Sequence, residues 1–528
     1  MSKMLLLLLI PFATIVLAFF LIKLNRNYAI TCLVRKIKTI DGSPIENTAS
    51  IAGGFWGSNF DLLSMNLEQM FQYSRNFAKT FKRSYIQYFL LAPVYNVIDA
   101  REAELVLNDS RMLTKGFIYT YLRPFLKTGL LTSTDKKWHT RRRLLTPAFH
   151  FNILAQFMET FKSESSKFIN NLNGLLEKEN SNGIISLSEL IPRVTLNNVC
   201  ETALGVCLDE RLDGDEYRQG IAEVEESFLE RLKNPLKAFN TIYYNSTEGK
   251  KYLKSMNKLH AFSSGIIEKR RELLSKEIEE EEESDVNRNE IDENSIYRKR
   301  RYAMLDTLLR AEKDGLIDHE GICEEVDTFM FEGFDTTSMN LIFALMSLAL
   351  YPEMQKKCYE ELQEHIPDND LSSLDIQQLN NLKYLDCFIK ETQRLYPSVP
   401  SIIRKCTSDI VVDGKLLFPK GTQIMIHIYD IHTNPKYYDE PEKFNPERFM
   451  APQADKRHPF AFIPFSGGQR NCIGQKFALI EMKTLLIYVL KNFVLESVTC
   501  PEDFRFHLGL LIRTKTNIQI RIRKRVAL

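Results

Sequence analysis

The sequence predicts a mainly α-helical protein with a small β region. Most of the chain has helical patterning, and its longest helical run, from about residue 322 to 350, is apolar nearly all round after Met339. Such a helix is expected at the centre of a core. Few segments have strand patterning: residues 410–417 predict a hairpin around Asp413-Gly414, and residues 423–428 predict another strand.

The N-terminus predicts a membrane anchor. Residues 4–22 form an uncharged, apolar stretch of 19 residues, close to the roughly 20 that a helix needs to cross a bilayer. More basic residues follow the stretch than precede it, so the rest of the chain is expected on the cytoplasmic side. A cleaved secretory signal is the alternative, but no clear small-residue cleavage site follows. We expect an anchor at 1–23, a connector at 24–60 and the main domain at 61–528.

Composition narrows the choice of partners and compartment. The formal net charge of +1 gives no global signal for nucleic-acid binding. The nine cysteines are odd in number and scattered, which fits a reducing compartment rather than a disulfide framework. Residues 276–297, which include five consecutive glutamates at 279–283, predict a solvated, disordered acidic loop.

The strongest chemical signal surrounds Cys472, in the segment Phe-Ser-Gly-Gly-Gln-Arg-Asn-Cys-Ile-Gly at residues 465–474. Glycines allow a sharp turn and close approach of the backbone to a flat ligand. A thiolate at such a turn suits the axial position of a haem iron, and Arg470 is placed to bind a haem propionate. A buried core thiol is the simpler alternative. Zinc is disfavoured, because the chain has no Cys-x-x-Cys or His-x-x-x-His pair.

A second motif, Glu-Gly-Phe-Asp-Thr-Thr at residues 332–337, lies within the long helical run. Glycine weakens a helix, and a buried threonine can bond back to the preceding turn. We expect a local opening of the helix, with Asp335 and Thr336 delivering protons to the reacting oxygen. The alternative is a kink in which Asp335 forms a salt bridge elsewhere.

Two further pairs lie at helical spacing. Trp138 and Arg142 are four residues apart, so an indole N–H and a guanidinium can reach one haem propionate. Glu391 and Arg394 are three apart and can pair on one helix face.

Together these motifs resemble those of the cytochrome P450 superfamily, in the expected order along nearly the whole chain. The resemblance implies the triangular-prism fold, haem b bound through Cys472, and a further propionate ligand at Arg404. It also implies a buried structural network of Glu391, Arg394 and Arg448. Glu332 stands where most members have Ala or Gly, and the run from 325 to 333 is similar to the fatty-acid ω-hydroxylase family 4. In many members of that family this glutamate forms an ester with a haem methyl group, so Glu332 is expected to bind the haem covalently. The family commonly has His where this chain has Phe334.

The resemblance further implies a monooxygenase of long-chain fatty acids or related lipophilic molecules, acting at or near the chain terminus. Its expected partners are membrane lipid, NADPH–cytochrome P450 reductase and cytochrome b5, at the endoplasmic reticulum membrane. Lys137, Arg141 and Lys476 are expected on the surface that receives the reductase. Isoprenoid hormones and xenobiotics are alternative substrates. A haem-thiolate isomerase, a non-catalytic haem protein and a helical scaffold are alternative functions.

Overall fold

The computed structural model describes residues 64–525, apart from 82–83, 90–91, 179–181, 209–213, 235, 238, 287–302, 368–369, 413–415 and 501–503, together with residues 13, 14, 17, 18, 20 and 21. These last residues are helical. Most of the expected anchor and all of the expected connector lie outside the described residues.

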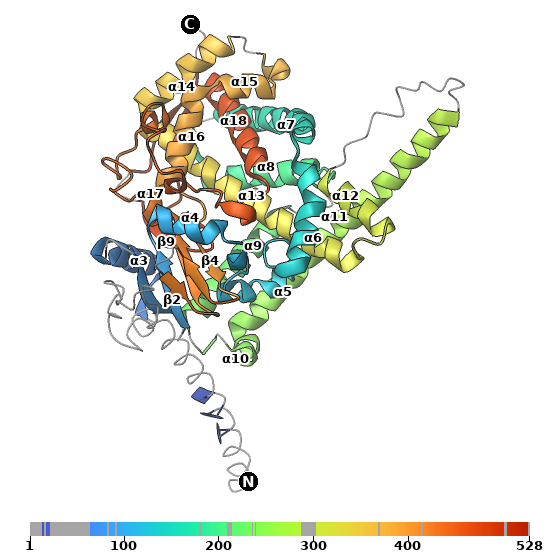
Figure 1. Cartoon of the computed structure of the whole chain (residues 1–528). Coiled ribbons are helices and arrows are strands. Elements are labelled where there is room, and N and C mark those ends of the chain that lie inside the picture. The colour runs from blue at the N-terminus through green and yellow to red at the C-terminus, as the bar shows by residue number, and fades with distance from the viewer. Residues whose placement is uncertain are drawn as a thin grey trace.

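Helices make up most of the described chain, as the sequence predicts. Figure 1 shows them surrounding a central α13, with a strand-rich region to one side. Their bounds are α3 Leu67–Phe81, α4 Ala100–Asn108, α5 Arg123–Leu126, α6 Asp135–Leu145, α7 Phe151–Leu176, α8 Leu187–Thr202, α9 Gly214–Lys233, α10 Asn240–Asn245, α11 Thr247–Val286, α12 Met304–Lys313, α13 His319–Leu350, α14 Pro352–His365, α15 Ile376–Asn381, α16 Lys383–Leu395, α17 Ile428–His432 and α18 Gln475–Asn492.

The strands form small, separate sheets. Their bounds are β1 Tyr85–Phe89, β2 Ala92–Val97, β3 Ile184–Ser186, β4 Ser401–Lys405, β5 Ile410–Val412, β6 Leu416–Phe418, β7 Gln423–His427, β8 Phe493–Ser497, β9 Phe506–Leu508, β10 Ile512–Thr514 and β11 Gln519–Lys524. The largest sheet has the order β1-β2-β7-β4, in which only β2 and β7 are parallel. The order β3-β11-β8 forms a second sheet, and β9 pairs with β10. The predicted hairpin is confirmed as β5 and β6, although its turn lies outside the described residues.

Helix α13 is the predicted central helix and begins three residues earlier than expected. Asp318 caps it by accepting a hydrogen bond from the backbone N–H of Gly321 at 2.8 Å. The helix is long and apolar enough to cross a membrane, but its most apolar window is 83% buried inside the molecule. It packs against α8, α11, α16 and α18. Burial on all sides explains its nearly uniform apolar character.

The acidic segment departs from the prediction. We expected a loop from residue 276 to 297, but α11 continues to Val286. Glutamate is a good helix former, and a helix that has already started adds residues at little cost. The remainder of the predicted loop lies outside the described residues.

The expected network around Glu391 is confirmed. The carboxylate of Glu391 accepts hydrogen bonds from Arg394 at 2.7 and 2.8 Å and from Arg448 at 3.0 Å. Glu391 and Arg394 have no exposed side-chain surface. Arg394 also donates to the carbonyl oxygens of His432 and Pro441. The network therefore ties α16 to the segment that leads to Cys472, and its role is structural.

Candidate active site

The backbone around Cys472 forms a tight loop directly before α18. The N–H of Cys472 donates to the carbonyl oxygen of Phe465 at 2.9 Å, which closes the loop. Gly468 has φ +65°, and a Cβ there would lie 1.9 Å from the carbonyl oxygen of Leu107. Only glycine satisfies both constraints. The loop therefore holds Cys472 against the N-terminus of α18.

The thiol of Cys472 faces an internal cavity rather than the outer surface. Burial raises its pKa to about 11, while the backbone N–H of Gly474 and the charge of Arg142 act in the opposite direction. A bound metal ion deprotonates a coordinating thiol outright. The cavity in front of the thiol has a volume of about 360 Å³, which leaves space for a bound group that carries a metal ion.

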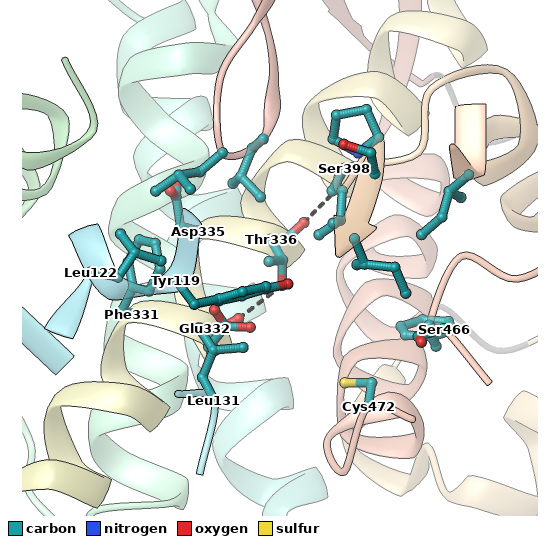
Figure 2. Close-up of a pocket in the computed structure, with 18 of the residues that line it drawn as sticks. Tyr119, Leu122, Leu131, Phe331, Glu332, Asp335, Thr336, Ser398, Ser466 and Cys472 are labelled. Carbon is teal, nitrogen blue, oxygen red and sulfur yellow. Dashed lines mark hydrogen bonds between the residues drawn. The ribbon is translucent and has the colours of Figure 1, made fainter. Parts of the chain in front are cut away.

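Every site residue that the sequence predicted lines this one cavity. The catalytic and haem-binding candidates come from α6, β4, α13 and the Cys472 loop: Trp138, Arg142, Glu332, Asp335, Thr336, Arg404, Arg470 and Cys472. The remaining wall is largely apolar, with Leu131, Phe228, Phe331 and Leu510 among its members. Figure 2 shows Cys472 across this space from Glu332 and Thr336 of α13.

Buried cations gather at one wall of the cavity. The guanidinium of Arg470 lies 4.4 Å from the ring centre of Trp138 and donates to the carbonyl oxygens of Leu130 and Ser133. Its Nε has no hydrogen-bond partner within the described part of the chain. Arg404 is 2% exposed. Half-buried Lys115 lines the same cavity, and the charges of Arg404 and Arg470 act on its ammonium group.

These cations destabilise one another. Burial and the charge of Arg404 lower the pKa of Arg470 to about 9. Burial, Arg404 and Arg470 hold the pKa of Lys115 well below its usual range. Among the described residues, none of the three forms a salt bridge with a carboxylate. Two carboxylates supplied by a ligand would correct this imbalance, and haem carries two propionates. The residues present therefore fit haem.

Arg142 lines the cavity and also binds the loop that carries Cys472, so its contact with a haem propionate stays a prediction. Its Nη1 donates to the carbonyl oxygen of Asn471 at 2.9 Å and its Nη2 to the side-chain Oδ1 at 2.8 Å. The guanidinium thus clamps α6 to the Cys472 loop. It borders the cavity, and each terminal nitrogen keeps a second N–H beside the one bonded to Asn471.

The predicted opening of α13 does not occur, because residues 332–337 remain helical. The hydroxyl of Thr336 donates to the carbonyl oxygen of Glu332 at 2.8 Å, and that of Thr337 donates to Gly333 at 2.9 Å. Ser398, which follows α16, donates to the carbonyl oxygen of Thr336 at 2.9 Å. Figure 2 shows the Ser398–Thr336 and Thr336–Glu332 bonds.

The two acids of the motif at residues 332–337 differ in their partners. Burial raises the pKa of Glu332 to about 7, with Lys115 opposing the shift. Among the described residues, no hydrogen-bond partner contacts its carboxylate. Asp335, in contrast, accepts from Arg513 of β10 at 2.7 Å. The alternative prediction of a salt-bridged Asp335 is therefore met, but without a break in the helix.

One residue expected on the reductase-facing surface is buried. Arg141 is 8% exposed and lies 3.9 Å from Glu324 and 3.8 Å from Glu325 of α13. Lys137 is partly exposed and pairs with Glu324 at 2.6 Å. Lys476 is exposed. Arg141 therefore joins α6 to α13 and cannot form a docking surface.

Sequence reasoning missed Lys115, Ser398, Arg513 and Glu225. None lies in a motif, and each reaches the site from a loop, a short strand or a distant helix. Only their tertiary contacts identify them.

Comparison with known proteins identifies the class. The model of the Cytochrome P450 family matches residues 54–521. The chain therefore belongs to the cytochrome P450 family, a class of haem-thiolate monooxygenases. It is 49% identical over 517 residues to Probable cytochrome P450 4p3 of Drosophila melanogaster, covering 97% of this chain and 98% of that protein. It is 47% identical to Probable cytochrome P450 4ac1 over 98% of both chains, and 38% identical to Cytochrome P450 4d1 over 85% and 88%, both of Drosophila melanogaster. The family assignment favours a monooxygenase over the isomerase, sensor and scaffold alternatives.

Proposed function

We propose that this monooxygenase hydroxylates long-chain fatty acids or related lipophilic molecules at or near the chain terminus. The observation that carries the proposal is the Glu332 carboxyl group, which lines the cavity opposite Cys472 and has no protein partner among the described residues. A carboxyl group in this position is free to bond to the edge of the haem. The largely apolar wall suits a hydrocarbon chain.

We assign the iron ligand to Cys472 and the propionate contacts to four residues of the cavity wall: Trp138, Arg142, Arg404 and Arg470. When bound, the haem supplies the oxygen chemistry. The protein binds and orients the substrate, excludes water through its apolar wall, and moves protons at the Asp335 carboxylate and the Thr336 hydroxyl. Because the Thr336 hydroxyl donates to its own helix, it must rotate to transfer a proton.

The ester at Glu332 would form by oxidation of a haem methyl group. In this ester the Glu332 carboxyl group would lose its proton and hold the edge of the haem, and the haem with dioxygen would supply the two-electron oxidation. A haem fixed in this way holds the cavity wall rigid, which favours attack at a terminal methyl over a weaker internal C–H bond.

Denaturing extraction tests the ester directly. In acidified organic solvent, haem should stay with the wild-type polypeptide and dissociate from Glu332→Ala, and the peptide containing Glu332 should gain the mass of haem. Products of dodecanoic acid should shift from terminal to internal hydroxylation in the same variant. Complete extraction of haem from the wild type, or unchanged regiochemistry in the variant, would contradict the proposal.

The ligand assignment has a separate test. The carbon monoxide difference spectrum of the reduced wild-type protein should have the strongly red-shifted band of thiolate-bound haem, and Cys472→Ala should lose it. A panel of isoprenoids and xenobiotics alongside dodecanoic acid distinguishes the alternative substrate classes.

The superfamily's triangular prism and an N-terminal anchor in the endoplasmic reticulum membrane complete the proposal. Electrons come from NADPH through cytochrome P450 reductase, with cytochrome b5 as a second donor. The support is the apolar stretch at residues 4–22 with its following basic residues, and the family assignment.

A further inference from the structure

Arg513 of β10 connects α13 and α9, two helices that border the cavity. Its Nη2 lies 2.7 Å from Asp335 of α13, and its Nε lies 2.5 Å from Glu225 of α9. The Asp335 and Glu225 side chains are 6% and 7% exposed, and that of Arg513 is 27% exposed. One cation is thus shared by two buried carboxylates, in a geometry that solvent screens only weakly.

The turn between β9 and β10 fixes the second carboxylate. The N–H of Leu511 donates to Glu225 at 3.4 Å. A Cβ on Gly509 would lie 2.6 Å from the same carboxylate oxygen, so the turn and Glu225 are in close contact. Both Gly509 and Leu511 line the cavity. The ion pair therefore joins Asp335 of the predicted proton-delivery motif to the β9–β10 turn in the cavity wall.

Several charged or titratable groups act on Asp335. Burial raises its pKa to about 6, Arg513 opposes the rise, and Glu225 adds to it. The groups that face Asp335 or its partner Arg513 are Glu225 and Tyr217 of α9, Glu332 of α13, and His507 of β9. Within the described residues, Arg513 is the only cation that forms a salt bridge with Asp335.

We propose that Arg513 is a positioning residue for proton delivery: it orients the Asp335 carboxylate and sets its charge, and Glu225 moderates that effect by sharing the cation. The proposal rests on the proposed monooxygenase function and deepens it. Removing the cation should make Asp335 harder to ionise. Removing the competing carboxylate should make Asp335 easier to ionise, because Arg513 then pairs with Asp335 alone.

Hydrogen peroxide release reports where the protons go. Productive turnover converts RH, O2, NADPH and H⁺ into ROH, H2O and NADP⁺, with two protons on the oxygen atom that leaves as water. Unproductive turnover converts O2, NADPH and H⁺ into H2O2 and NADP⁺, with one proton on each oxygen atom. The peroxide formed per NADPH therefore measures proton placement, independently of overall rate.

The experiment uses the full-length chain with cytochrome P450 reductase in phosphatidylcholine vesicles. Peroxide per NADPH is measured against pH, with and without dodecanoic acid, for wild type, Arg513→Gln, Arg513→Lys and Glu225→Gln. Peroxide per NADPH should rise as pH falls and Asp335 becomes protonated. The midpoint of this rise should move to higher pH in Arg513→Gln, by about one unit or more, and to lower pH in Glu225→Gln. Arg513→Lys keeps the charge and should stay near wild type. Arg521→Gln, which removes a cation from an exposed pair with Glu496, should cause no shift.

Opposite shifts are the decisive result, because a purely structural ion pair would lower thermal stability in both variants without moving the pH profile in opposite directions. Equal profiles, or shifts of the same sign, would overturn the proposal. If dodecanoic acid does not change peroxide release by the wild type, the fatty-acid proposal is contradicted instead. The Arg513 effect can still be measured without substrate, because O2 is then divided between H2O2 and the reaction of O2 with two NADPH and two H⁺ to two H2O and two NADP⁺. The carbon monoxide difference spectrum of each variant identifies any loss of haem.

Discussion

At the scale of single residues, the site depends on backbone positions that admit one residue type. Gly468 combines a left-handed conformation with a contact that leaves no room for a Cβ. Gly315 is a useful comparison, because it has φ +68° but open space around its would-be Cβ. The two positions separate the cost of the conformation from the cost of the contact.

We predict that Gly468→Ala destabilises the protein more than Gly315→Ala. The left-handed conformation alone costs an alanine about 1–2 kcal/mol, and Gly468→Ala must also displace the carbonyl group of Leu107. The loss should appear as a lower Tm and less haem bound per chain, whereas Gly315→Ala should keep full haem content. Equal effects in both variants would show that the Leu107 contact is unimportant.

Single residues also mark the limit of sequence reasoning. Cys472 and Thr336 were predicted because each lies in a motif whose spacing is chemically informative. Arg513 and Lys115 lie outside any motif, without a pattern that separates them from solvated surface charge. Their importance depends on a carboxylate or another cation that the fold brings close, and one sequence does not contain that information.

At the scale of elements, the contact between α8 and α18 contains an unusual buried acid. Glu481 of α18 is 1% exposed and accepts a hydrogen bond from the side-chain amide of Asn198 at 2.7 Å. No cation contacts it within the described structure. Burial raises its pKa to about 8, and the bond from Asn198 opposes the rise. The carboxyl group is therefore mostly protonated in the folded protein at neutral pH.

This acid predicts a specific pH dependence of stability. The unfolded chain releases the Glu481 proton near pH 4.5, whereas the folded chain retains it to about pH 8. Between these values the folded state binds more protons, so its contribution to the free energy of unfolding falls as pH rises and levels off above pH 8. The free energy of unfolding, measured by denaturant titration at several pH values, should fall more steeply with pH in wild type than in Glu481→Gln over this window. An equal pH dependence of the unfolding free energy in the two proteins would mean that Glu481 is ionised in the folded protein.

The helices also show which elements could be predicted. The central α13 was located within three residues, because a long, uniformly apolar run of this kind fits a buried helix and little else. The extension of α11 was missed, because a run of glutamates satisfies both a solvated loop and an exposed helix. Composition alone does not distinguish them, and the preceding helix decides the outcome.

At the scale of the whole molecule, the cavity is assembled from segments that are far apart in sequence. Helix α6, the β9–β10 turn and the Cys472 loop meet around α13, and Arg142 and Arg141 connect α6 to the loop and to α13 respectively. The sequence predicted the members of the site but not these connections. Resemblance to a family supplied their common location, which spacing within one chain does not.

The cluster of Lys115, Arg404 and Arg470 has a consequence for how the protein is made. Three basic side chains are held in a poorly solvated wall, where the charged form of each is costly. This penalty raises the free energy of the folded polypeptide and falls when two carboxylates bind. A molecule that binds the native state and not the unfolded chain stabilises it by mass action. Haem supply during synthesis should therefore control how much of this chain reaches and keeps its native state. In a haem-poor cell the native state of this chain should be less stable, and the chain should be degraded faster by proteases.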